Sequence, residues 1–374
     1  MDKLFVGFAN IGIQQIIMYI IGGILIYLAI KKEYEPMLLL PIGFSAILVN
    51  LPLSAVLDYE GTPGVLKILF DAGIQTELFP VLIFVAVGAM IDFTPLLANP
   101  KTLFFGAAAQ FGIFATTVVA LLCGADDLKV ASAIGIIGAA DGPTAIFVAS
   151  KFAQKYLGPI TVAAYSYMSL VPIVQPPVIR LLTTKEERMI RMEYKDVKVP
   201  KPVKILFPIF VTVIAGIIAP ISVPLVGLLM FGNLIRESGV LERLSKAAQN
   251  ELANIVTILL GITIGSTMVA EDFLQPMTLI ILLGGLAAFI FDTAGGVLFA
   301  KFLNLFLKKK INPMVGAAGI SAFPMSARVI QKMAQKEDPS NFILMHAVSA
   351  NVAGQLGSII AGGLILALVP LLVG

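Results

Sequence analysis

Asp141 is the residue whose position points most directly to chemistry. It lies in ASAIGIIGAADGPTAIFVASKFAQK, residues 131–155, where Asp-Gly-Pro interrupts an apolar run. Proline breaks a helix, and a carboxylate in such surroundings is costly unless a cation or donor compensates it. Freed carbonyls, the hydroxyl of Thr144 and this carboxylate would supply the hard oxygen ligands that an alkali ion prefers. The alternative is a protonated or helix-capping Asp141 with a purely structural role.

A second interrupted segment, GAAGISAFPMSARVIQKMAQK, begins at Gly316 and contains Ser321 and Arg328. An arginine beside a helix break suits a ligand that bears a carboxylate, through a bidentate contact. Arg328 could instead extend to the cytoplasmic surface beside Lys332. Asn312, which precedes a proline, offers either an oxygen ligand or a helix N-cap.

Other polar residues lie deep within apolar runs. Tyr167 carries a phenol that could pass a proton when buried, whereas Tyr165 is interpreted as a packing or interfacial residue. Asn351 and Gln355 share the stretch HAVSANVAGQLGS. Asp292 lies in the middle of a long apolar run and is a functional candidate by depth, although it could simply face a cavity with a hydrogen-bond partner.

The composition places these residues in a lipid bilayer. Of the 374 residues, 58% are hydrophobic and only 13% are charged, and the mean hydropathy is +0.95, far outside the range of soluble domains. A helix needs about 20 apolar residues to cross the hydrocarbon core. Runs that approach or exceed this length occur at 13–30, 37–56, 79–90 with its flanks, 102–123, 162–182, 205–223, 253–270, 277–307 and 342–373.

The lone cysteine and the lone histidine narrow the chemistry further. With only Cys123 and His346, the chain cannot build a disulfide framework, a zinc or haem site, or a cysteine-protease pair. A net charge of +3 gives no indication of nucleic-acid binding. We therefore expect no transition-metal site.

The two interrupted segments are copies of one another. Residues 135–155 align without a gap over residues 316–336, and the identical pairs include Gly135/Gly316, Gly138/Gly319, Pro143/Pro324, Val148/Val329, Lys151/Lys332, Gln154/Gln335 and Lys155/Lys336. We interpret the chain as a duplication with an N-terminal membrane half (1–182, first broken segment 131–155) and a C-terminal membrane half (205–374, second broken segment 312–336). A basic linker (183–204) joins them.

Charge distribution gives the halves opposite orientations. Basic residues gather in the linker and at Lys308–Lys310, which predicts a cytoplasmic location, whereas Asp126 and Asp127 fall on the outer side. These loop positions are consistent with one another only if residues 131–155 form a re-entrant segment or a broken helix. Paired, interrupted segments in inverted halves indicate an ion and substrate site at the bilayer midplane. The predicted fold is an all-α polytopic membrane protein with two inverted-topology repeats whose broken or re-entrant helices meet at that depth.

Three stretches resemble the β subunit of the sodium-translocating decarboxylases: GAADGPTAIFV from Gly138, AAYSYMSLVPIVQPP from Ala163 and NPMVGAAGISAFPMSARV from Asn312. The family includes subunits of oxaloacetate, methylmalonyl-CoA, glutaconyl-CoA and malonate decarboxylases. The resemblance implies that a carboxyl group, placed on biotin by a separate subunit, is released here as carbon dioxide. Sodium ions move outward and a proton is consumed.

The resemblance also implies roles for particular residues. Asp141 would be the sodium and proton site, Tyr167 the proton donor, and Arg328 a further catalytic residue. Asn312, Gly316, Ser321 and Asn351 would bind sodium. Apart from the resemblance, position within apolar runs makes Thr144, Gln355 and Asp292 additional intramembrane polar candidates.

The same resemblance implies the setting of the protein. The cofactors would be Na⁺ and carboxybiotin carried on a partner. The expected partners are a carboxyltransferase α subunit, a biotin carrier protein and a small membrane-anchoring subunit. We expect a multi-pass protein of the bacterial inner membrane that forms a homo-oligomer such as a trimer.

The main alternative is an inverted-repeat, sodium-coupled secondary transporter for a small carboxylate. Such a protein would use the same broken helices and would bind its substrate through Arg328. A pump subunit requires a biotinylated partner, whereas a symporter moves its substrate alone.

Overall fold

The computed structural model describes residues 7, 10–59, 61–193 and 197–373. The described part of the chain is helical apart from loops and a small antiparallel hairpin of β1 (Asp58–Tyr59) and β2 (Thr62–Pro63). Within the described residues, eight helices are long and apolar enough to cross a membrane, or nine if one bent pair counts as a span. The prediction of an all-α polytopic membrane protein is therefore confirmed.

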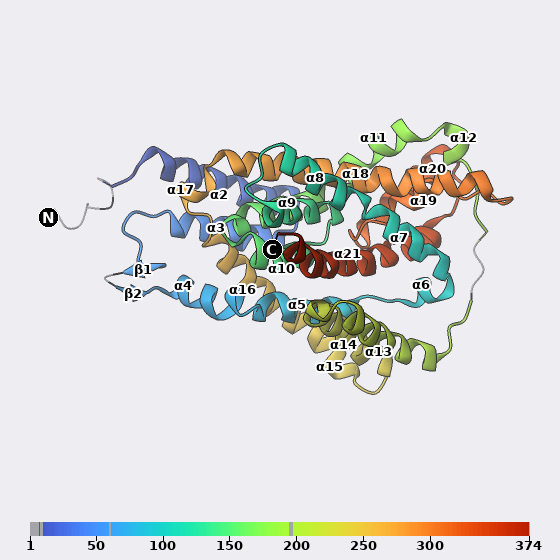
Figure 1. Cartoon of the computed structure of the whole chain (residues 1–374), viewed down its shortest axis with the longest axis horizontal. Coiled ribbons are helices and arrows are strands. Elements are labelled where there is room, and N and C mark those ends of the chain that lie inside the picture. The colour runs from blue at the N-terminus through green and yellow to red at the C-terminus, as the bar shows by residue number, and fades with distance from the viewer. Residues whose placement is uncertain (1–6, 8–9, 60, 194–196, 374) are drawn as a thin grey trace.

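One group of helices packs mainly on itself, through contacts of α5 with α14, α2 with α3, and α3 with α16. Figure 1 shows α13, α14 and α15 along one long side of the molecule. The elements of this group are α2 (Ile13–Lys32), α3 (Pro36–Val49), α4 (Val65–Phe70), the π-turn η1 (Asp71–Gln75), α5 (Leu78–Met90), α13 (Lys201–Ile218), η5 (Pro220–Ser222), α14 (Val223–Ser238), α15 (Glu242–Ala247), η6 (Ala248–Leu252), α16 (Ala253–Gly265) and α17 (Ala270–Phe273).

The second group contains both broken segments and packs around the long helix α18, which contacts α8, α11 and α19. Its elements are α6 (Thr94–Ala98), η2 (Pro100–Thr102), α7 (Leu103–Ala109), α8 (Phe111–Leu122), α9 (Leu128–Gly135), η3 (Ile136–Ala139), α10 (Gly142–Phe152), η4 (Gln154–Tyr156), α11 (Leu157–Leu182), α18 (Pro276–Phe306), α19 (Met314–Ala317), α20 (Met325–Glu337) and α21 (Leu344–Val373). The linker holds the short helix α12 (Lys185–Arg188).

The first broken segment folds back on itself. Asp127 caps α9 by accepting the Val130 N–H at 2.7 Å, and the chain reverses at Ala140, whose φ is 53°. Pro143 then stands in the first turn of α10, where a missing N–H costs nothing. The phenol of Tyr156 donates to Asp126 at 2.6 Å, which brings the two ends of the segment together.

The second broken segment also returns to the end from which it starts. Asn312 donates to the backbone carbonyls of Arg188 and Ile190 at 2.8 and 2.9 Å. At the other end of the segment, Glu337 accepts from the side chain of Arg188 at 2.9 Å. The linker therefore holds both ends of this segment.

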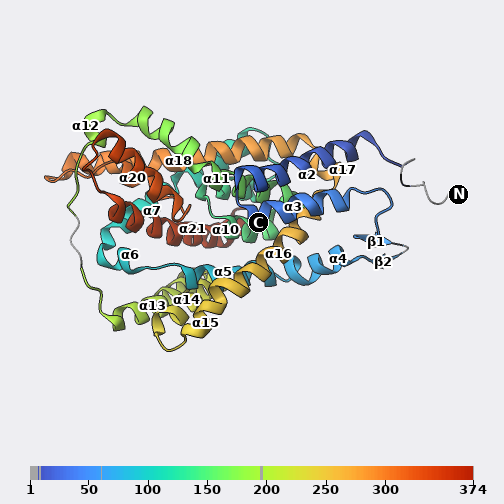
Figure 2. The same ribbon diagram turned by 180° about the vertical axis from the view of Figure 1, so that it is seen from behind.

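The two segments enter from opposite ends of the molecule and meet inside it. The first begins and ends near α17, which contacts η4, and the second begins and ends at α12. These two short helices lie at opposite ends of the long axis in Figures 1 and 2. At the meeting point the Ser321 N–H donates to the carbonyl of Ala139 at 2.9 Å.

Two apolar runs differ from the helices that form. The run at 37–56 gives a helix of only 14 residues, because the chain turns at Asn50, whose side chain bonds the carbonyls of Ala46 and Met268. The run at 205–223 ends early, and α14 forms a separate candidate span that the sequence analysis did not predict. Its polar Asn233 and Arg236 obscured the apolar pattern, yet both bond carbonyls at the end of α5.

Close packing of α5 on α14 depends on glycine. A Cβ on Gly88 would strike the carbonyl of Leu229 on α14. We expect Gly88→Ala to destabilise the protein by about 1–3 kcal/mol through overpacking, measured as thermal unfolding of the detergent-purified protein. Gly23→Ala is the matched control, because its new Cβ would lie more than 4 Å from every atom beyond its chain neighbours and the nearby backbone of its own helix. Equal stability of the two variants would contradict the inferred packing.

Candidate functional site

Asp141 is placed at the junction of the segments by the local sequence. It is the N-cap of α10 and accepts the Thr144 N–H at 3.4 Å, with Pro143 fixing the first helical turn. The side chain is only 3% exposed. The break therefore buries a carboxylate inside the second helix group.

Three neutral donors surround one oxygen of this carboxylate. Asp141 Oδ2 accepts from the hydroxyls of Thr144 and Ser358, both at 2.7 Å, and from the amide of Gln355 at 3.1 Å. Among the described residues, no lysine, arginine or histidine forms an ion pair with it. The carboxylate thus has hydrogen-bond donors without a fixed countercharge.

Ser358 is the member of this shell that sequence reasoning missed. It lies on α21 and follows Asn351 and Gln355 at helical spacings of seven and three residues, so the three side chains share one helix face. That periodicity was the available signal. A single serine in a long apolar helix carries little weight without it.

The tip of the second segment lies against the same helix. Ser321 donates its hydroxyl to the carbonyl of Gly354 at 3.1 Å. Asn351 donates its amide to the carbonyl of Ile320 at 2.6 Å, and its buried Oδ1 has no hydrogen-bond partner among the described residues. The structure therefore brings Asp141, Thr144, Ser321, Asn351 and Gln355 to one junction of α10, the second tip and α21.

Other predicted site residues lie elsewhere. Asn312 is buried against the linker, and Gly316 packs on Gly296 of α18, where a Cβ would strike a backbone carbonyl. Arg328 is exposed on α20, and its guanidinium forms no hydrogen bond or ion pair with another described residue. Asp292 is fully buried in α18 and accepts the Ile113 N–H at 3.1 Å.

The two tyrosines of α11 point to different neighbours. The phenol of Tyr167 donates to the carbonyl of Leu282 on α18. The ring of Tyr165 instead fills the space beside Gly142, where a Cβ would collide with it. Tyr165, interpreted from sequence as a packing residue, is thus the tyrosine nearest the Asp141 turn.

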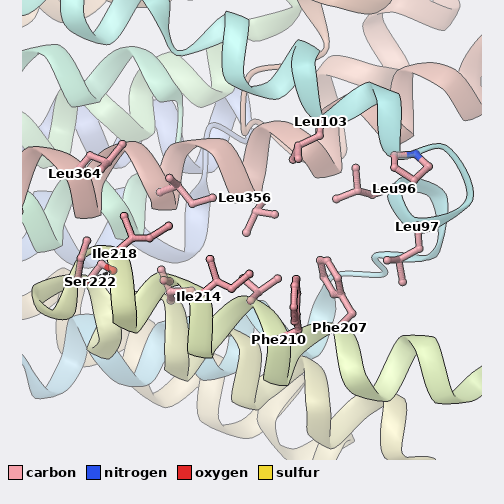
Figure 3. A pocket seen from close by; sticks show the side chains of 16 residues that line it. Leu96, Leu97, Leu103, Phe207, Phe210, Ile214, Ile218, Ser222, Leu356 and Leu364 are labelled. Atoms are coloured by element: carbon pink, nitrogen blue, oxygen red, sulfur yellow. Dashed lines mark hydrogen bonds between the residues drawn. The ribbon is translucent and has the colours of Figure 1, made fainter.

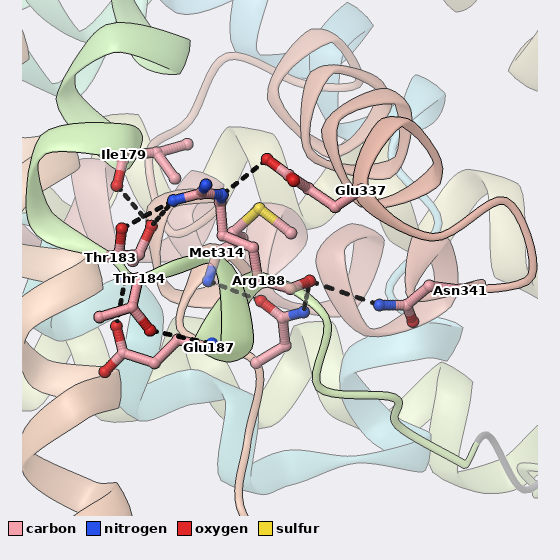
Figure 4. Close-up of polar contacts among 9 residues, drawn as sticks. Ile179, Thr183, Thr184, Glu187, Arg188, Met314, Glu337 and Asn341 are labelled. Carbon is pink, nitrogen blue, oxygen red and sulfur yellow. Dashed lines mark hydrogen bonds and ion pairs between the residues drawn. The ribbon is translucent and has the colours of Figure 1, made fainter.

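Ion pairs hold the linker on the base of the second segment. Figure 4 shows Arg188 between Thr183 and Glu337, donating to the Thr183 carbonyl at 2.7 Å and to the Glu337 carboxylate at 2.9 Å. The neighbouring Arg191 donates to Asp338 at 2.7 Å, and this hydrogen bond and charge hold the pKa of that carboxyl below its ordinary value.

A cavity of about 800 Å³ with both apolar and charged residues in its lining opens beside this linker. Among the described residues, its charged lining consists of Arg191, Glu193, Lys309 and Lys310, so cations exceed anions there, and Ile311 brings it next to Asn312. The ion pair of Lys309 with Glu193 has an N···O distance of 3.3 Å and is highly exposed. The cavity is suited to an anionic group arriving at the linker end of the molecule.

A second hollow is apolar and chemically different. It lies between α13 and α21, measures about 360 Å³, and Figure 3 shows Phe207, Phe210 and Ile214 facing Leu356 across it. Among the described residues that line it, Ser222 alone is polar, and its hydroxyl is already bonded to the Ala219 carbonyl at 2.7 Å. This groove offers nothing to a charged substrate.

The oxygen-rich junction favours a hard monovalent cation. One carboxylate, hydroxyls and amide oxygens match alkali-ion ligation better than the nitrogen and sulfur sets of softer metals. No group of three or more His, Cys, Asp or Glu that could hold a metal ion occurs in the described part of the chain. Fold and site together define a multi-pass membrane protein in which two broken helices meet at a buried carboxylate.

Comparison with known proteins identifies the family. The model for the family described as the Na⁺-transporting oxaloacetate decarboxylase beta subunit matches residues 14–369, and the chain belongs to this family. It is 48% identical to methylmalonyl-CoA decarboxylase subunit beta of Propionigenium modestum, over 97% of this chain and 96% of that protein. It is 52% identical to glutaconyl-CoA decarboxylase subunit beta of Acidaminococcus fermentans (94% and 92%) and 47% identical to oxaloacetate decarboxylase beta chain 2 of Salmonella typhi (96% and 96%).

The linker contacts yield a test of their own. Glu337→Gln removes the charge that Arg188 meets, and a hydrogen bond to a charged group contributes about 1.5–3 kcal/mol. A loss of about 1.4 kcal/mol changes an equilibrium constant tenfold, so the linker should be detached from the second segment about tenfold more often or more. Trypsin should then cleave the linker faster by the same factor. Glu186→Gln, on the exposed face of α12, is the control. Equal cleavage of both variants would show that the ion pair does not hold the linker.

Proposed function

We propose that this chain is the membrane subunit in which a sodium-pumping decarboxylase releases carbon dioxide from carboxybiotin. The proposal rests on one observation above others: a carboxylate only 3% exposed, surrounded by neutral donors, where two broken helices meet. A buried charge in a membrane protein needs a partner, and a mobile cation is the partner that a pump requires. Membership of a sodium-transporting decarboxylase family supports this reading.

The proposed sodium shell consists of Asp141, Thr144, Ser321, Asn351 and Gln355, with Ser358 added from its contact with the carboxylate. A hydroxyl has one donor and two acceptor lone pairs, so Thr144 and Ser358 can rotate to present oxygen to an ion. The unbonded Oδ1 of Asn351 is a further oxygen available for ligation. Asn312 and Gly316 support the site from a distance in this arrangement, because their contacts are with the linker and α18.

The proposed reaction breaks the bond between the carboxyl carbon and the ureido nitrogen of biotin. Carbon dioxide leaves, and a proton replaces the carboxyl group on nitrogen. The exposed guanidinium of Arg328 is suited to bind the departing carboxylate through two parallel hydrogen bonds. Tyr167 is the proposed proton donor, and the cation-rich cavity beside the linker is the proposed entry for the carboxylated biotin.

Transport against a membrane potential requires a chemical source of free energy. Moving one charge costs about 2.3 kcal/mol per 100 mV, so two sodium ions expelled against ~150 mV need roughly 7 kcal/mol. Decarboxylation can supply this only if the ion is exposed to one face at a time. We propose that the halves 1–182 and 205–374 act as inverted repeats for this purpose. Entry of the broken segments from opposite ends of the molecule supports such a relation.

The assembly and location belong to the same proposal. The chain would work in the bacterial inner membrane as a homo-oligomer such as a trimer. Its partners would be a carboxyltransferase α subunit, a biotin carrier protein that presents carboxybiotin, and a small membrane-anchoring subunit. The choice of acid or CoA ester would reside in the carboxyltransferase.

The decisive experiment uses the reconstituted complex in proteoliposomes. Carbon dioxide release from carrier-bound carboxybiotin is measured with and without sodium, together with radioactive sodium uptake into inside-out vesicles. Sodium-stimulated release with concurrent uptake is the expected result. Carboxylate uptake driven by a sodium gradient without any release would instead identify a secondary transporter.

Asp141→Asn should abolish sodium-dependent decarboxylation while the protein still inserts and assembles. The loss should reach at least about 100-fold, because even a residue that only orients an ion ligand costs 10–100-fold in affinity when changed. Asp272→Asn, at an exposed position on α17, is the control and should behave as wild type. Turnover retained in Asp141→Asn would remove this residue from the mechanism.

Tyr167→Phe should slow turnover by about 100-fold or more, the contribution typical of a positioned acid, and should leave sodium binding unchanged. Turnover is read from carbon dioxide release, and sodium binding from protection against proteolysis. Tyr27→Phe, on the exposed face of α2, provides the matched control. If Tyr167→Phe loses sodium protection and turnover together, the phenol serves the ion site and not proton delivery.

A further inference from the structure

Asp292 is a second carboxylate buried inside the helix group that carries Asp141. It lies in the middle of α18 and is 0% exposed. Its two oxygens have different surroundings: Oδ1 accepts a backbone N–H, whereas Oδ2 has no hydrogen-bond partner among the described residues. The mechanism proposed above leaves this residue without a role.

The bonded oxygen holds the start of α8. The helix pair α7 and α8 is interrupted at Gln110, whose side chain does not cap α8 and instead donates to the Gly106 carbonyl at 2.9 Å. The Ile113 N–H donates both to the Gln110 carbonyl at 3.2 Å and to Asp292 Oδ1 at 3.1 Å, so the carboxylate adds a second acceptor at this interruption. Gly112 permits this approach, because a Cβ there would strike the backbone and carboxylate of Asp292.

The other oxygen lies against the turn that leads to Asp141. A Cβ on Gly138 would lie 2.8 Å from Asp292 Oδ2 and 2.6 Å from the side chain of Ala288. Gly138 belongs to η3, which contacts α18 along its length and ends one residue before the reversal at Ala140. In the same turn, the Ala139 carbonyl accepts the Ser321 N–H from the second segment. Asp292 therefore fixes the surface on which the Asp141 turn rests.

We propose that Asp292 is a positioning residue of the sodium site, acting through Gly138. Held by the Ile113 N–H of α8, its carboxylate sets the position of η3 and thereby the direction in which Asp141 and its shell face the ion. This inference rests on the proposed function, since it assigns the support of the same ion site. Residues that orient an ion ligand affect affinity by about 10–100-fold when they are changed.

The test measures sodium dependence in the reconstituted complex. For Asp292→Ala, the sodium concentration that half-saturates carbon dioxide release should rise by about 10–100-fold, with a smaller change in the maximal rate at saturating sodium. Asp292→Asn keeps an acceptor for Ile113 and should show a smaller rise. Simple loss of folded protein would lower the maximal rate and leave half-saturation unmoved. Asp272→Ala, at an exposed position on α17, is the matched control.

A pair of variants tests the contact itself. Gly138→Ala alone should raise half-saturating sodium, because its methyl group meets both Ala288 and Asp292 Oδ2, whereas Gly23→Ala should not. In Asp292→Ala/Gly138→Ala the contact with the carboxylate is gone, while the close approach to Ala288 remains. The double variant should therefore raise half-saturating sodium by less than the two single effects multiplied together, a non-additivity expected of residues in contact.

Two results would overturn the inference. One is a half-saturating concentration for folded Asp292→Ala within twofold of wild type. The other is full additivity of the two substitutions. Both leave sodium-stimulated release by the wild-type complex intact, so they are distinct from failure of the proposed function, in which the wild-type complex itself shows no such release.

Discussion

The cost of an unpaired carboxylate in hydrocarbon governs this structure. Asp141 is withdrawn from water at the junction of two broken helices, and no lysine or arginine of the described chain neutralises it. Its compensation comes from two hydroxyls and one amide. Neutral donors reduce the cost of burying a charge without removing the charge, and this is the ground for the proposal that a mobile cation binds here.

That requirement explains why three distant parts of the chain converge. Thr144 comes from the helix that Asp141 caps, and Gln355 and Ser358 come from α21, more than half the sequence away. Ser321 lies at the tip of the second broken segment and joins it to the first segment and to α21. Its N–H donates to the Ala139 carbonyl, and its hydroxyl donates to the Gly354 carbonyl. Irregular backbone survives at this depth because protein covers it. The junction thus shields both the carboxylate and the irregular backbone of the two interrupted helices from lipid.

Local signals were sufficient to predict part of this site. Asp-Gly-Pro in an apolar run identified the break, and the matching of residues 135–155 with 316–336 identified its counterpart. Sequence could not reveal that Asn312 faces the linker, because its partners are backbone carbonyls of Arg188 and Ile190 far away in the chain. Side-chain direction across a helix interface depends on tertiary packing that periodicity alone does not specify.

The hydroxyls and the amide around Asp141 differ in how they could respond to a bound ion, and this difference could link ion binding to the arrangement of the two broken segments. A hydroxyl donates to a carboxylate when no ion is present and can turn a lone pair toward an ion when one arrives, so Thr144 and Ser358 can serve both states without moving their backbones. Gln355 has no such freedom, because its donor and acceptor are separate atoms. An ion that recruits the amide oxygen must therefore move this side chain, and α21 also holds the second tip through Asn351. Differential contacts of this kind are what allow a bound ion to favour one arrangement of the segments over another.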